Sequence, residues 1–158
     1  MLVQGRCFKM FLLSIILYFF LFGGFFEMKQ LTILTENKPG ILGQIASLLG
    51  RSGINMESLT ADTTAESGII RVLTKDVETA KKVLKENNFS VVESDIACLG
   101  ILDRPGELGK IAQLIAREGI NIDQIYLLSK NHDKAFLAVK VNDLNKLNSK
   151  FKEYVVNY

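Results

Sequence analysis

From residue 28 onward, short apolar segments alternate with amphipathic segments that have helical periodicity. Two of the amphipathic segments show apolar residues at i, i+3, i+4 and i+7, which predicts a helix with one face in the core. These residues are Leu42, Ile45, Ala46 and Leu49 in the first segment, and Leu108, Ile111, Ala112 and Ile115 in the second.

Strand-like segments surround these helices in the same order twice. The first unit is predicted as strand 30–35, a helix from 39, a strand from 54 to about 63, a turn at 65–68, strand 69–74, helix 77–86 and strand 90–93. The second unit is predicted as strand 97–102, helix 106–118, strands 123–129 and 135–141, helix 144–152 and a short last strand at 154–157. The order βαββαβ is the ferredoxin-like α+β arrangement, an antiparallel sheet with two helices on one face. Because no linker separates Glu93 from Ala97, we expect the two units to share one extended sheet.

The two units are copies of one another. Residues 37–56 recur as 103–122 at a constant offset of 66, and eleven of the twenty positions are identical. Such self-similarity indicates two homologous units of about 65 residues. We therefore divide the chain into a leader, 1–27, unit 1, 28–95, and unit 2, 96–158.

Both prolines of the chain, Pro39 and Pro105, occupy the same place in the repeat. Proline suits the first turn of a helix and holds the preceding residue extended, so a loop that turns into a helix is predicted at each Pro-Gly pair. Each of these helices is expected to end at a glycine, Gly53 or Gly119, in the left-handed position after the helix.

Composition and charge narrow the function. The chain has 158 residues, is 48% hydrophobic and has a net charge of +2, with no run of lysine or arginine, so direct nucleic-acid binding is not expected. Two cysteines without CxxC spacing and a single histidine argue against a disulfide scaffold, a metal site and a histidine-based triad. Cys98 is interpreted as a buried small hydrophobe. No cofactor site and no catalytic constellation is recognised.

The leader contains an apolar run over 11–26, preceded by Arg6 and Lys9. It has the layout of a signal segment, and it is short for a membrane span of ~20 residues. Alternatively, translation begins at Met28, where the patterned and charged part of the chain starts. The expected location is cytoplasmic, or the membrane if 11–26 is a genuine anchor.

With these motifs in view, the repeat resembles the ACT domain, a small-molecule regulatory module of amino-acid metabolism. The resemblance rests on the N/D-x-P-G-x-L segment after the first strand, the G-I-N step after the first helix and the βαββαβ order. It covers 28 to about 151, and it implies a stand-alone tandem ACT protein. The small regulatory subunit of acetolactate synthase resembles unit 1 well, but its second half lacks the Pro-Gly copy found here.

The resemblance implies a non-catalytic sensor that binds a free amino acid at the interface of two units, with a homodimer or a target enzyme of amino-acid metabolism as partner. The alternative is a regulatory subunit of a biosynthetic enzyme that acts through assembly. The implied binding residues are the loop residues Asn37, Pro39, Gly40, Ile41 and Leu42 with Asn121 and Ile122, and reciprocally Asp103, Gly106 and Leu108 with Asn55 and Met56.

The chemistry of the two copies differs. Free N–H groups at a helix start suit an α-carboxylate, and an asparagine amide can accept from an α-ammonium. Asp103 and Glu107 carry negative charge where unit 1 has Asn37 and Ile41, so we expect the Asn37/Asn121 site to be the tighter one. The Pro-Gly pair also has a simpler explanation, as a turn that serves packing or dimerisation alone.

Overall fold

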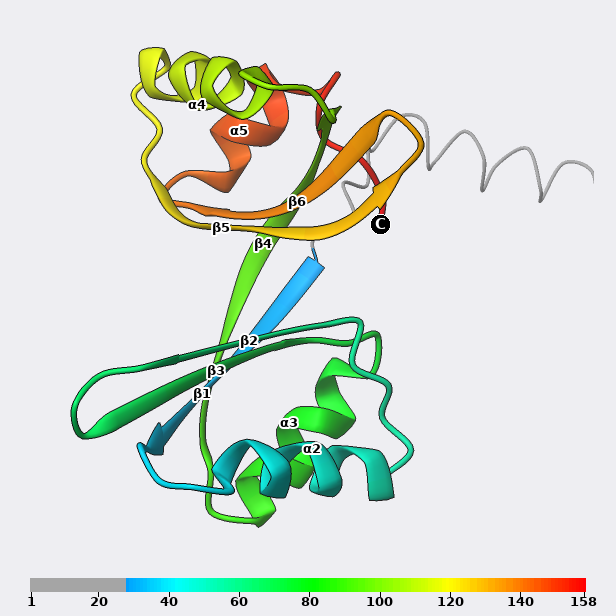
Figure 1. The fold of residues 1–158 in the computed structure, drawn as a ribbon. Helices are drawn as coiled ribbons and strands as arrows, with labels where there is room; N and C mark the ends of the chain where they lie inside the picture. The colour runs from blue at the N-terminus through cyan, green and yellow to red at the C-terminus, as the bar shows by residue number, and fades with distance from the viewer. Residues whose placement is uncertain (1–27) are drawn as a thin grey trace, which may run out of the picture.

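The computed structural model describes residues 28–158, and the interpretations of the leader lie outside them. Four layers are stacked in Figure 1: a helix pair, the strands of unit 1, the strands of unit 2, and a second helix pair. Within the described residues, no helix is long and apolar enough to cross a membrane.

The elements follow the predicted order. Unit 1 comprises β1 (Met28–Glu36), α2 (Ile41–Arg51), β2 (Ser58–Thr63), β3 (Ser67–Leu73) and α3 (Val77–Glu86), followed by β4 (Ser90–Leu102). Unit 2 continues with α4 (Glu107–Arg117), β5 (Ile122–Asn131), β6 (Lys134–Val141) and α5 (Leu144–Lys150). All strand pairs are antiparallel, and the helices of each unit cover one face of its strands, which confirms the predicted fold class.

One continuous strand, β4, joins the units. Its first half pairs with β1 and its second half with β6, giving a six-stranded sheet in the order β2-β3-β1-β4-β6-β5. The two strands predicted at 90–93 and 97–102 are therefore one strand, and the boundary between 95 and 96 falls inside it. The expectation of one shared sheet is confirmed.

The short last strand of unit 2 is reduced to a bridge. Leu99 of β4 pairs with Val155, and the Val156 N–H donates to the Cys98 carbonyl at 2.9 Å. The C-terminal segment thus takes the place in unit 2 that the first half of β4 takes in unit 1, where it lies beside β1.

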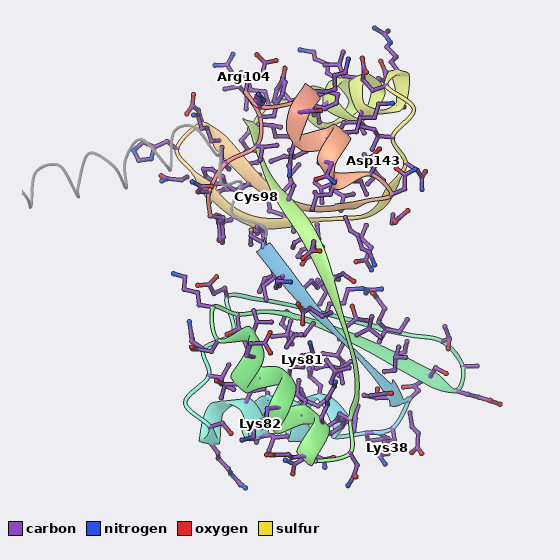
Figure 2. The ribbon with its side chains drawn as sticks, turned by 180° about the vertical axis from the view of Figure 1, so that it is seen from behind. Lys38, Lys81, Lys82, Cys98, Arg104 and Asp143 are labelled. Carbon is purple, nitrogen blue, oxygen red and sulfur yellow. The ribbon has the colours of Figure 1, made fainter. Side chains whose placement is uncertain are left out.

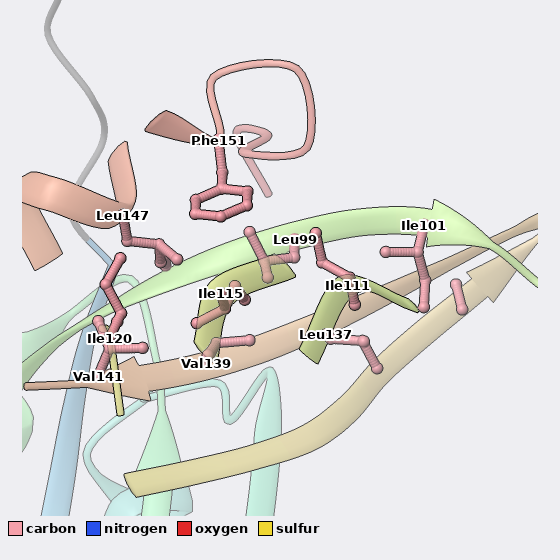
Figure 3. Packing of buried hydrophobic residues seen from close by; sticks show 12 residues of the cluster. Leu99, Ile101, Ile111, Ile115, Ile120, Leu137, Val139, Val141, Leu147 and Phe151 are labelled. Carbon is pink, nitrogen blue, oxygen red and sulfur yellow. The ribbon is translucent and has the colours of Figure 1, made fainter. Parts of the chain in front are cut away.

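Each unit has its own hydrophobic core between helices and sheet. In unit 1, Leu31, Ile33, Ile45, Leu49 and Leu84 are fully buried. The unit 2 core is shown in Figure 3 and is centred on Leu99, Ile115, Val139 and Leu147.

The opposite faces of the two half-sheets contact each other. A small apolar cluster of Leu73, Ile96 and Ala138 forms the centre of this contact. Beside it, the amide of Gln30, which is fully buried, lies 2.9 Å from the Gln124 amide and 2.9 Å from the Tyr126 hydroxyl. Arg71 contacts the Gln124 amide and forms an ion pair with Asp62. The units are thus held together by the shared strand and by a face-to-face contact.

The Pro-Gly pairs form turns and not the first helical turn, which corrects the sequence prediction. The Ile41 N–H donates to the Lys38 carbonyl at 3.4 Å, and Gly40 has φ 87°. Proline second and a positive-φ glycine third is the type II β-turn, which requires glycine at that place. Unit 2 repeats it, with Gly106 at φ 90°. Each helix begins one residue after the glycine.

The helix ends are as predicted. Gly53 and Gly119 have φ 72° and 70°. In α2 the Gly53 N–H donates to Gly50 and the Ile54 N–H to Leu49, both at 3.0 Å, which is the paired bonding of a Schellman motif.

The predicted core face of α2 and α4 is wrong at one position in each helix. Leu42 is 39% exposed and Leu108 is 46% exposed, whereas Ile45, Leu49, Ile111 and Ile115 are buried. In α2 the residues that pack into the core besides these are Ile41 and Leu48. Leu42 lies on the same side of α2 as Leu49, seven residues later, but it is in the first turn of the helix, where it stays exposed.

An ion-paired carboxylate ties three elements of unit 1 together. Glu93 on β4 accepts from Lys29 of β1 at 2.6 Å and from Lys81 of α3. The hydrogen bond from Lys29, followed by that from Lys81, lowers the pKa of Glu93 from 4.5 to about 2.

We predict that this carboxylate makes the protein acid-sensitive. A lowered pKa contributes stability that is fully present above the unfolded value of 4.5 and is lost as the pH falls towards about 2. In urea unfolding measured from neutral pH downwards, Glu93→Gln should be less stable at neutral pH and should lose less stability in this window than the wild type. Glu86→Gln, at an exposed carboxylate 3.9 Å from Lys82, should keep the wild-type acid slope. If Glu93→Gln loses stability with falling pH as steeply as the wild type does, Glu93 is not the source of the acid sensitivity.

Candidate functional site

The loop between β1 and α2 is fixed by backbone and side-chain bonds to the β2–β3 turn. The Asn37 N–H donates to the Glu66 carbonyl at 3.0 Å, and its Nδ2 donates to the Thr64 carbonyl at 3.1 Å. The Asn37 amide oxygen is therefore left as the group that can accept from a ligand. Asn37, Pro39, Gly40 and Leu42 are all exposed, with Ile41 half-buried beneath them.

The start of α2 offers backbone donors. Gly40 is the N-cap residue, so no side chain caps the first-turn N–H groups, and the first turn of α2 contains no acidic residue. Free N–H groups at a helix start favour an anionic group such as a carboxylate. An amide oxygen such as that of Asn37 can accept a hydrogen bond from an ammonium group.

A cavity of about 410 Å³ lies beside this loop. The end of β1, the β2–β3 turn and the α3–β4 turn form its wall, which includes Thr35, Lys38, Ile41, Ser67 and Phe89. The Thr35 Oγ1 atom is buried and has no hydrogen-bond partner within the described residues. Buried hydroxyls are nearly always hydrogen-bonded, so Thr35 provides a polar group without an explanation in the fold.

Gly68 makes room for this hydroxyl. It pairs with Thr35 across β1 and β3, and a Cβ at Gly68 would come within 2.5 Å of the Thr35 Oγ1 atom. Neither residue was predicted as part of the site. The repeat holds the signal, because the residue of unit 2 that corresponds to Thr35 is Ile101, and Ile101 pairs with Ala135.

The corresponding place in unit 2 is apolar and ion-paired. Ile101 is 8% exposed and belongs to the unit 2 core. The Asp103 carboxylate accepts from Lys130 at 2.8 Å, and the Glu107 carboxylate from Lys110 at 2.6 Å. Because both carboxylates are paired, their repulsion of a ligand is weaker than the sequence suggested.

The residues expected opposite these loops lie at the starts of the two edge strands, β2 and β5. Asn121 is exposed, and its Nδ2 donates to Asp123 at 2.9 Å, while its N–H donates to Asn142 at 2.9 Å. Ile122 is half-buried against the unit 2 core. In unit 1, Asn55 is exposed and Met56 packs against the core.

Within one chain the two halves of the predicted site stay apart. Asn37 contacts residues of unit 1, and Asn121 contacts residues of unit 2. In Figure 2, Lys38 and Arg104, which precede the two Pro-Gly pairs, lie at opposite ends of the molecule. The units meet through their sheet faces, so the pairing of Asn37 with Asn121 stays a prediction that concerns a second chain.

The described residues include no group of three His, Cys, Asp or Glu side chains that could hold a metal ion. Cys98 is 1% exposed, and burial raises the pKa of its thiol to about 11. A thiol in that state is a poor nucleophile. The polar groups that this site offers are suited to binding.

Comparison with known proteins agrees with the repeat. The family model described as an ACT domain pair matches residues 26–154. A probable acetolactate synthase small subunit from Archaeoglobus fulgidus is 31% identical over 99 residues, which are 53% of this chain and 62% of that protein. The chain thus matches about three fifths of the length of this relative.

Two solved structures show the same fold. Protein BT0572 from Bacteroides thetaiotaomicron superimposes with a TM-score of 0.76 at 29% identity, over 82% of this chain and 92% of that one. The regulatory subunit of aspartate kinase from Thermus thermophilus superimposes with a TM-score of 0.54 at 19% identity, over 72% of this chain and 83% of that one. This likeness concerns the fold alone. Sequence repeat, topology and family match agree, and the chain belongs to the ACT domain family as a tandem pair of ACT domains.

Proposed function

We propose that the protein is a sensor that binds a free amino acid without transforming it. The observation that carries this proposal is the difference between the two units at one position of the repeat. Unit 1 places the unpartnered Thr35 hydroxyl beside a cavity of about 410 Å³, where unit 2 has the buried Ile101. The α2 N–H groups would receive the α-carboxylate, and the Asn37 amide oxygen the α-ammonium.

We further propose that a second copy of the chain completes this site. The outer strands of the sheet are β2 and β5, and both carry exposed apolar residues: Leu59 on β2, Ile125 and Leu127 on β5. Unprotected edge strands readily pair with another chain. Antiparallel pairing of β2 with β5 of a second copy would set the end of β2, where Thr64 binds Asn37, against the start of β5, where Asn121 and Ile122 lie. The two loops that lie apart in one chain would then meet.

The first experiment is a thermal-shift screen of the full chain against the twenty amino acids, followed by calorimetry. A ligand that binds only the folded protein raises its melting temperature. Asn37→Ala should weaken the selected ligand about tenfold or more, since a hydrogen bond to a charged group contributes ~1.5–3 kcal/mol. Asp103→Ala should leave binding close to the wild type. The reverse result would mean that unit 2 holds the ligand.

Mixing the two weakened variants tests whether a second copy of the chain completes the site. If each site combines Asn37 of one chain with Asn121 of another, Asn37→Ala alone and Asn121→Ala alone each weaken every site of the dimer. A mixed dimer then contains one intact site and one doubly altered site. An equimolar, fully exchanged mixture should recover about one quarter of the wild-type sites, as expected for a two-fold symmetric dimer. No recovery would place both residues in the same chain or outside the site.

The second candidate is a regulatory subunit that acts by assembly with a biosynthetic enzyme. It is favoured by the match to the probable acetolactate synthase small subunit. The two candidate functions predict different behaviour for the isolated chain. A flat screen on a folded protein, together with a change in the activity of an acetolactate synthase catalytic subunit on mixing, would favour assembly over sensing by the chain alone.

A further inference from the structure

A second cavity, of about 380 Å³, lies where unit 1 meets the C-terminus of unit 2. It is at the start of β1 and the end of β3, whereas the amino-acid site lies at the end of β1. Its apolar wall is formed by Met28, Leu73, Val77 and Tyr158. Its size is within the range of small-molecule sites.

Unit 2 contributes this wall through a fixed segment. The Val156 N–H bonds to β4 at 2.9 Å, and the ring of Tyr158 packs against Phe136 with 6.1 Å between ring centres. Tyr158 is nevertheless 43% exposed. An aromatic side chain that is anchored on one side and open on the other is well placed to cover an apolar ligand.

The charged groups of this cavity are two lysines, Lys29 and Lys75, and one carboxylate, Glu57. Lys75 forms an ion pair with Glu57 at 3.2 Å, and its side chain is 81% exposed. An exposed pair of this kind is weak, and an ammonium group has three donors, so Lys75 can bind a second carboxylate. Lys29, the other lysine of the cavity, is already bound to Glu93 and Asp95 at 2.6 and 3.2 Å.

We propose that this cleft between the units is a second ligand site, for a small apolar monocarboxylate whose carboxylate binds Lys75 and whose apolar body lies between Leu73, Val77 and Tyr158. Such a ligand contacts both units, so its binding would resist any change in their relative position. The site is independent of the proposed amino-acid site.

The test uses the full chain, labelled with ¹⁵N, and titration with 4-methylpentanoate, with its neutral amide as comparison ligand. We expect saturable shifts at Lys29, Thr74 and Tyr158 with the acid, and weaker binding of the amide. Lys75→Glu should weaken the binding of the acid about tenfold, as expected for loss of a charge-assisted hydrogen bond. Lys82→Glu is the matched control, because Lys82 is 74% exposed on α3 and outside the cleft. It should bind the acid as the wild type does.

A second variant separates the contribution of the apolar wall to binding from that of the charge. Tyr158→Ser should weaken acid and amide by the same factor, and the surface change Val92→Ser should weaken neither. Asn37→Ala should leave these shifts unchanged, which distinguishes this cleft from the amino-acid site. The proposal is overturned if no saturable shift occurs at millimolar acid, if the amide binds as well as the acid, or if the shifts cluster around Asn37.

Discussion

Leu49→Ala should destabilise the protein by about 2–5 kcal/mol, a large part of the stability of a small protein. Leu49 is fully buried in the unit 1 core, and truncation removes its packing and leaves a cavity. Leu42→Ala is the same chemical change on the same helix, at a residue that is 39% exposed. It should cost less than about 1 kcal/mol. Urea unfolding followed by far-ultraviolet circular dichroism measures both.

The same variant tests whether the units unfold together. Between residues 28 and 158 the tyrosines are Tyr126, Tyr154 and Tyr158, all in unit 2, and the chain has no tryptophan. Because β4 belongs to both units, the tyrosine signal should shift with the far-ultraviolet signal when Leu49, in unit 1, is truncated. A tyrosine transition that stays at the wild-type midpoint would show that the units unfold separately.

The features that the sequence predicted well are set by local rules. The left-handed glycines Gly53 and Gly119 follow from helix termination alone. The repeat supplied the domain organisation without any tertiary information. The exposed position of Leu42 did not follow from spacing, because Leu42 shares the stripe of Leu49 but lies in the first turn of α2, directly after the turn at Pro39-Gly40.

The continuity of β4 also required tertiary information. Residues Ile96 to Leu99 are all apolar and nearly fully buried, because one face of β4 packs on the unit 2 helices and the other on the contact between the half-sheets. A strand covered on both faces loses the alternation by which strands are recognised. The predicted strands 90–93 and 97–102 left a gap at 94–96 that the backbone does not have.

The loop of the candidate site was predicted from a motif, and the groups that distinguish its two copies were not. Asn37 and Gly40 belong to the recognisable segment. Thr35 and Gly68 lie in strands, where a threonine and a glycine are unremarkable until the register places them opposite each other. Only comparison of Thr35 with Ile101 across the repeat could have indicated a polar site in unit 1.

The contact between the half-sheets supports the second large effect, which we expect from Gln30→Leu. Leucine has a similar size, but it leaves the Tyr126 hydroxyl without its partner at 2.9 Å, whereas the Gln124 amide keeps its contact with Arg71. An unpaired buried polar group costs about 1–3 kcal/mol, so Gln30→Leu should destabilise the protein by about this amount. The polar face of the contact is therefore predicted to depend on this one amide.

A double-mutant cycle isolates the pair. Tyr126→Phe removes the hydroxyl that Gln30→Leu leaves unpaired, so the double variant should be more stable than the sum of the single changes predicts, by about 1 kcal/mol. Gln30→Leu combined with Leu42→Ala, which lies outside this contact, should be additive. Additivity in both combinations would mean that the bond between Gln30 and Tyr126 contributes nothing.

Alkaline unfolding provides an independent measurement of the same hydroxyl. Burial raises the pKa of Tyr126 from 10 to about 12. The unfolded chain therefore loses this proton first, so the stability contributed is fully present below pH 10 and falls as the pH rises towards about 12. Tyr126→Phe has no proton to lose at this position and should show a smaller decline over that range. Because the hydroxyl lies between the half-sheets, an unchanged decline would mean that the contact between the units opens before Tyr126 ionises.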